Sequence, residues 1–263
     1  SFTIESVPIQ STSEVIASAA NYRFGVPVTV TAGTWAGTSV ITVSRAWYRC
    51  DSSAAVSSGT GLASALAPAG CTAISGATGT SYTPVAADLT KYLAVAETAS
   101  NTTSMGSNLR TTFVSTATTV EKQTQTITFG ALANATYGDP AITLTASSDR
   151  SMTITYASSN TAVCTVSGST LTVVAPGTCD VTASQAGNAT TLAASDVVRT
   201  LTVVKANQTI NLPAFTAGVY GGAAKASGAT ATSGLTVTLT SADTSVCTVS
   251  GLSVNIVAPG NCS

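Results

Sequence analysis

The stretch Val163-Cys164-Thr165-Val166-Ser167-Gly168 occurs a second time in the chain, as Val246-Cys247-Thr248-Val249-Ser250-Gly251. The two copies lie 83 residues apart. A period of this length corresponds to a whole β-sandwich domain and not to one rung of a solenoid, so the sequence predicts tandem domains. The same spacing relates three more pairs of segments: Gln125-Thr126-Ile127 and Gln208-Thr209-Ile210, Tyr137-Gly138 and Tyr220-Gly221, and Ala175-Pro176-Gly177 and Ala258-Pro259-Gly260.

The residues around this stretch alternate apolar and hydroxyl side chains, which is typical of strands with one buried face. Turns containing glycine or proline, such as Gly138-Asp139-Pro140, separate these runs. About seven short strands per unit must pair into two sheets packed face to face. The expected fold is all-β, with tandem immunoglobulin-like β-sandwiches and one disulfide per domain. The strands expected in the two repeats are 142–146, 152–156, 171–174, 181–184, 197–204 and 235–239.

Six cysteines fall into three pairs that are close in sequence. Zinc sites favour a short CxxC or Cys/His grouping, and the chain has neither such spacing nor any histidine. One pair per domain therefore predicts structural disulfides and an oxidising compartment, which places the protein outside the cell, at the cell surface or secreted. A disulfide that closes a loop of about 15 residues is worth roughly 3 kcal/mol, which compensates for cores with few aromatics. The expected bonds are Cys50–Cys71, Cys164–Cys179 and Cys247–Cys262.

The first unit differs from the two repeats and carries the candidate core aromatics Trp47 and Tyr92. Asp88 and Tyr92 stand four residues apart before an expected strand at 93–98, a spacing that predicts a tyrosine corner. The alternative for Trp47 is an exposed aromatic that binds a ligand. The segment 52–70, rich in Ala, Ser and Gly, is the longest irregular stretch and the candidate binding loop.

The expected division of the chain has four parts. Residues 1–14 form a leader that is either the last strand of a preceding repeat or a donor strand, 15–121 form the first domain, 122–204 the second and 205–263 the third. The third domain ends before the counterparts of 181–204, so it is expected to be incomplete. Two explanations remain open: the chain is a window on a longer tandem array, or a strand from a neighbouring copy completes the third domain.

Charge and composition exclude several classes of function. Ten basic and eleven acidic residues give a net charge of -1 without clustering, so no nucleic-acid partner is expected. No stretch reaches the roughly 18 apolar residues of a membrane span. Without histidine the usual general base is missing. Asp139, Asp149 and Asp180 are too isolated to suggest calcium. We therefore expect no catalytic residue, no cofactor and no metal site, and no enzyme.

The unit 125–204 resembles the bacterial Ig-like (MBG-like) repeats of large secreted and surface-anchored proteins, including actinobacterial-type arrays. The resemblance rests on Gln-Thr-Ile-Thr-Phe, Thr-Tyr-Gly-Asp, Ser-Asn-Thr-Ala-Val-Cys-Thr-Val-Ser-Gly, Ala-Pro-Gly-Thr-Cys and Ala-Ser-Gln-Ala-Gly-Asn. The first unit is similar to another bacterial Ig-like repeat through Ala32-Gly33-Thr34-Trp35, Trp47-Tyr48-Arg49-Cys50, 74–79 and 86–88. Such repeats serve as stalks, adhesin arms, filament subunits and surface-layer parts, and they imply no catalytic residues.

Two functions are compatible with these observations. Repetition, low charge and the lack of a chemical site favour a structural segment of a surface array, filament, sheath or surface layer, whose partners are copies of itself or neighbouring repeats. The divergent first unit favours instead an adhesin arm that binds a glycan, a protein or another cell-surface ligand through its loops.

Overall fold

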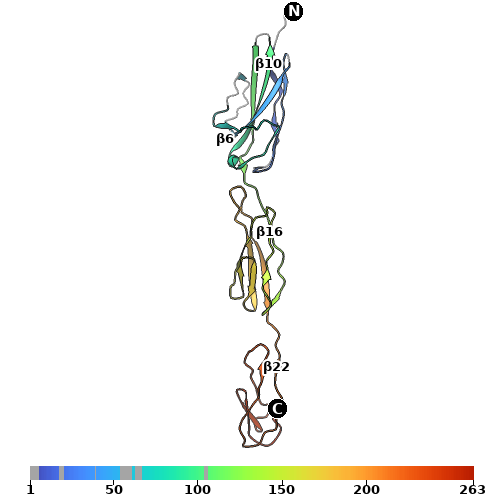
Figure 1. Cartoon of the computed structure of the whole chain (residues 1–263), viewed down its shortest axis with the longest axis vertical. Helices are drawn as coiled ribbons and strands as arrows, with labels where there is room; N and C mark the ends of the chain where they lie inside the picture. Colours follow the sequence, from blue (N-terminus) through green and yellow to red (C-terminus); the bar gives the residue numbers. More distant parts are fainter. Residues whose placement is uncertain (1–5, 18–20, 39, 54–60, 63–66, 104–105) are drawn as a thin grey trace, which may run out of the picture.

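The computed structural model describes residues 1–263 except 1–5, 18–20, 39, 54–60, 63–66 and 104–105. The described chain is all-β apart from short 3₁₀ turns such as Ala86–Asp88. Hydrogen-bonded strands form three groups that follow one another along the sequence. Figure 1 shows these groups in succession along the longest axis of the molecule.

The first group contains two sheets that face each other across a core. A five-stranded sheet has the order β7-β11-β10-β6-β8, and a three-stranded sheet has the order β2-β4-β9. Trp47, Leu93 and Val95 from the larger sheet pack against residues of β2, β4 and β9. The strands of this group are β1 (Ile9–Thr12), β2 (Val15–Ile16), β3 (Tyr22–Arg23), β4 (Val28–Thr31), β5 (Thr34–Ala36), β6 (Thr42–Cys50), β7 (Gly61–Leu62), β8 (Cys71–Ala73), β9 (Ser81–Tyr82), β10 (Tyr92–Thr103), β11 (Gly106–Ser115) and β12 (Val120–Glu121).

The leader expected at 1–14 does not stand apart from the first group in the structure. β1 pairs antiparallel with β5, with Ile9 opposite Ala36 and Gln10 opposite Trp35. Its described residues therefore form an edge strand beside the first sandwich. Residues 1–5 lie outside the described residues.

The second group is a sandwich of two sheets, and buried and exposed side chains alternate along its strands. One sheet has the order β14-β21-β20-β17 and the other β15-β19-β18. The inward residues Val181, Leu201 and Leu171 are all 0% exposed, while their neighbours along each strand carry hydroxyls. The strands are β13 (Ile127–Thr128), β14 (Ala135–Thr136), β15 (Ile142–Thr143), β16 (Ser147–Ser148), β17 (Thr155–Ser158), β18 (Cys164–Ser167), β19 (Thr170–Val173), β20 (Gly177–Ser184) and β21 (Val197–Val204).

The third group repeats only part of this arrangement. It has the pair β22-β24 and the sheet β23-β26-β25. The prediction of a strand at 235–239 is wrong, because these residues form no strand. In the second unit, β17 pairs with 181–184 of β20, and residues 205–263, all of which are described, contain no counterpart of that partner. The strands are β22 (Ile210–Asn211), β23 (Lys225–Ala226), β24 (Thr230–Ala231), β25 (Cys247–Ser250) and β26 (Ser253–Ile256).

Candidate functional site

Three disulfides are formed, and they connect strands in two different ways. Cys50 and Cys71 are opposite residues of neighbouring strands β6 and β8, with Cα atoms 4.0 Å apart. Cys164 on β18 and Cys179 on β20 belong to different sheets of the second sandwich, with Cα atoms 6.2 Å apart. The third bond, Cys247–Cys262, has the same sequence separation of 15. The second bond therefore joins two sheets, whereas the first ties one sheet together.

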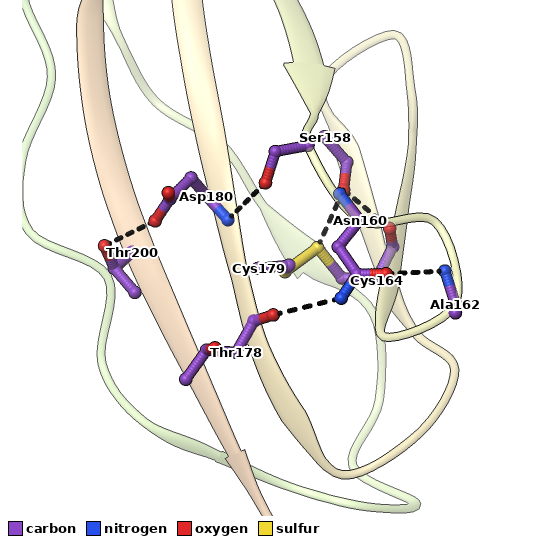
Figure 2. Close-up of a disulfide and its surroundings, with 9 residues drawn as sticks. Ser158, Asn160, Ala162, Cys164, Thr178, Cys179, Asp180 and Thr200 are labelled. Atoms are coloured by element: carbon purple, nitrogen blue, oxygen red, sulfur yellow. Dashed lines mark hydrogen bonds between the residues drawn. A yellow bond between two sulfur atoms is a disulfide. The ribbon is translucent and has the colours of Figure 1, made fainter.

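A polar network surrounds the Cys164–Cys179 bond at the surface (Figure 2). Ser158 Oγ donates to the Cys164 carbonyl at 2.8 Å, and Thr200 Oγ1 donates to Asp180 Oδ1 at 2.5 Å. The disulfide itself is shielded, because Cys164 is 0% and Cys179 2% exposed. A shielded bond within a hydrogen-bonded frame has a structural role and is not available for thiol exchange.

Trp47 is fully buried between the two sheets of the first sandwich. Its Nε1 donates to the Gly79 carbonyl at 2.9 Å, and its ring lies 5.8 Å from the ring of Tyr82. Tyr92, which we expected in the same core, is half-buried on the opposite face of β10 and packs beside Cys50 and Ala94. Alternation explains the difference: Leu93 points into the sandwich, so its neighbour Tyr92 must point away.

Asp88 contacts a tyrosine other than Tyr92, the residue with which its spacing predicted a tyrosine corner. Tyr82, not Tyr92, donates its hydroxyl to Asp88 Oδ2, at 2.6 Å. Asp88 is 0% exposed, and it also accepts from the Val85 backbone N–H at 2.8 Å and from Arg49 Nε at 2.9 Å. Burial, and then the Asp88 carboxylate, raise the pKa of Tyr82 to about 12. The tyrosine partner of Asp88 therefore comes from the preceding strand β9, which the spacing of Asp88 and Tyr92 did not indicate.

The segment 120–125 connects the first and second units through several hydrogen bonds. Val120 pairs with Tyr22, and Arg23 Nη1 donates to the Lys122 carbonyl at 2.7 Å. The backbone N–H of Gln123 donates to Thr190 in the second unit at 2.9 Å, while its side-chain Nε2 donates to Phe24 in the first at 2.7 Å. Gln123 therefore binds both units. At the next junction the residue 83 positions on is Ala206, which has no side-chain donor.

The third unit contains an open apolar groove of about 290 Å³, lined by Leu212, Phe215, Leu239, Val249, Val254 and Ile256. In the second unit the equivalent space is filled by β20 and β21, whose Val181, Ala183, Leu201 and Val203 are at most 3% exposed. A residue that lines this groove is therefore much more exposed than its counterpart in the second unit. Phe129 is 4% exposed, whereas its counterpart Leu212 is 50% exposed.

The candidate binding loop 52–70 falls largely outside the described residues, which omit 54–60 and 63–66. In the described part of the chain, no three Cys, Asp or Glu residues lie close enough together to bind a metal ion. No helix among the described residues has the length and apolar character needed to cross a membrane.

Comparison with known proteins assigns the chain to no family. No protein-family model and no curated protein matches the chain. Two solved structures are similar to it: the ectodomain (Ig1–Ig3) of mouse nectin-like molecule 4, and EC1–4 of Drosophila N-cadherin. The first is 13% identical over 77% of this chain and 67% of that chain, with a TM-score of 0.24. The second is 11% identical over 94% of this chain and 67% of that chain, with a TM-score of 0.27.

Proposed function

We propose that this chain is a non-catalytic structural segment of a bacterial extracellular surface array, filament, sheath or surface layer, built of tandem Ig-like domains. The domains are those expected from the sequence, 15–121, 122–204 and 205–263. The observation that carries the proposal is the exact 83-residue spacing of two units with the same disulfide. Repeated, disulfide-stabilised sandwiches with short connections form extended arms, whose stability is supplied unit by unit.

The junction between the first two units supports a role in extension. A freely jointed chain would need no contacts at its linker, yet segment 120–125 is hydrogen-bonded to both neighbours. An ordered junction transmits force and keeps successive domains in line. The three disulfides support an oxidising environment outside the cell, which is where the proposed array would lie.

Negative-stain electron microscopy of the native material tests the proposal. Regular fibres or lattices are the expected result, and isolated rods at all concentrations contradict it. The competing function is an adhesin arm in which the first unit binds a glycan or a protein. Isolated rods that bind specific members of a glycan array, with binding lost when 15–121 is deleted, would establish that alternative.

A further inference from the structure

The inward-facing row of β10 changes from apolar to charged at Glu97. Leu93 and Val95 belong to the core, and Glu97, two residues on, is also 0% exposed. Arg45 and Thr112 stand directly opposite it on the two neighbouring strands. Arg45 Nε and Nη2 each lie 2.7 Å from Glu97 Oε1, so one guanidinium compensates this carboxylate.

A second buried carboxylate, Glu14, lies beside this pair and has no cation. Glu14 is 3% exposed. Its Oε2 accepts from Thr112 Oγ1 at 3.0 Å and from Gln10 Nε2, whereas its Oε1 is buried and has no hydrogen-bond partner among the described residues. No lysine or arginine in the described part of the chain forms an ion pair with it. Arg45 is paired with Glu97, and an ionised carboxylate buried without a cation, as Glu14 would be, is strongly unfavourable.

Polar atoms of two strands, β1 and β10, converge on the space next to Gly33. A Cβ on Gly33 would lie 2.7 Å from Gln10 Nε2, 2.8 Å from the Thr12 carbonyl and 2.9 Å from Glu97 Oε2. The absence of a side chain at residue 33 therefore leaves room for this polar cradle. Turning the Gln10 amide about its last torsion would present Oε1 in place of Nε2, because the two ends have nearly the same shape.

We propose that Glu14 is the centre of a calcium site in the first unit. The available ligands are both oxygens of Glu14, Glu97 Oε2, the Thr12 carbonyl, Thr112 Oγ1 and the Gln10 amide oxygen. These are hard oxygen donors in an irregular arrangement, which suits Ca²⁺ better than Mg²⁺, since Mg²⁺ demands near-ideal octahedral geometry. The absence of histidine and free cysteine near the site disfavours zinc and other softer metals.

A calcium ion bound here would link β1 to the five-stranded sheet of the first unit. Gln10 and Thr12 belong to β1, Glu14 follows it, and Glu97 and Thr112 belong to β10 and β11. Only two of the ligands are charged, so the affinity belongs to the weak class of extracellular modules, with a Kd on the order of 0.1–1 mM. This inference is independent of whether the chain forms an array or an adhesin arm.

Calcium titration of the intact chain, after treatment with a chelator, tests the site. We expect one saturable Ca²⁺ per chain by calorimetry and a higher unfolding temperature of the first unit. Trp35 provides a local signal, because its Nε1 lies 3.4 Å from Glu97 Oε2 and its fluorescence should change on binding. Glu14→Gln should weaken Ca²⁺ binding by on the order of tenfold or more. It should also leave the calcium-free protein at least as stable as the wild type, because it removes the uncompensated charge.

Matched variants separate a site from a general effect of salt. Glu121→Gln changes an exposed carboxylate and should bind Ca²⁺ like the wild type. If Glu14→Gln does not fold, Thr112→Val removes one ligand from the same cradle and should also weaken binding. No calcium binding in the millimolar range would overturn the proposal. So would binding that survives Glu14→Gln, or an equal response to Na⁺ or Mg²⁺.

Discussion

Trp47 is the largest side chain in the first core, and its removal should have the largest effect of any single substitution there. Trp47→Ala creates a cavity between the two sheets and breaks the hydrogen bond to Gly79. We expect a loss of about 3–5 kcal/mol in the free energy of unfolding, measured by chemical denaturation. The exposed Val40→Ala, at a residue that is 83% exposed, should change stability little. An unchanged midpoint for Trp47→Ala, combined with lost ligand binding, would support the adhesin function instead.

Tyr82 should make the stability of the first unit fall at high pH. Its pKa is raised to about 12 by burial and by Asp88, whereas an unfolded tyrosine titrates near its ordinary value of 10.0. The folded state therefore holds the proton more tightly. The contribution of protonated Tyr82 to the free energy of unfolding is complete below pH 10 and is lost as the pH rises from about 10 to about 12. Stability measured against pH for the wild type and Tyr82→Phe should converge across this range, and parallel curves would disprove the role of Tyr82.

At the scale of elements, the second disulfide should stabilise the second unit because it joins its two sheets. Cys164→Ala with Cys179→Ala releases a loop with a sequence separation of 15 and should cost roughly 3 kcal/mol of unfolding free energy. Intact mass before and after reduction checks the starting state, since three disulfides gain six hydrogens on reduction. The matched variant Cys50→Ala with Cys71→Ala leaves both sheets of the first sandwich joined by their core. If free thiols react in the native wild-type chain, the starting state is not the one described.

The elements differ in how far the sequence could predict them. The strands at 171–174 and 197–204 were predicted to within a residue because alternation and flanking turns agree there. The strands at 142–146 and 152–156 are shorter or displaced, because pairing depends on a partner that local pattern does not show. The pairing of Glu14, Glu97 and Gly33 could not be predicted at all. It depends on the β1–β5 and β6–β10–β11 registers, which bring residues up to 102 positions apart into contact.

At the scale of the whole molecule, Gln123 should control how the first two units are oriented. Gln123→Ala removes the side-chain bond to Phe24 while keeping the backbone bonds to the second unit. We expect a wider distribution of interdomain angles by small-angle scattering or residual dipolar couplings, with little change in the melting of either unit. Gln125→Ala is the matched control, since its bonds stay within the second unit. Identical scattering of Gln123→Ala and the wild type would show that the backbone alone fixes the junction.

The groove of the third unit should accept a strand that resembles β21. In the second unit Leu201 lies opposite Cys179 in the ladder, and its side chain is 0% exposed in the same core as Phe129 and Leu171. The counterparts Leu212, Val254 and Cys262 line the groove. A synthetic peptide of residues 197–204 should therefore bind there and raise the unfolding temperature of the third unit. The gain is about 2.7 kcal/mol when free peptide reaches a hundred times its Kd. A peptide with Leu201→Asp and Val203→Asp should have no effect, because charged side chains would enter the apolar groove. If the two peptides have the same effect, the groove does not recognise the apolar face of a strand. The groove would then not be equivalent to the space that β21 fills in the second unit.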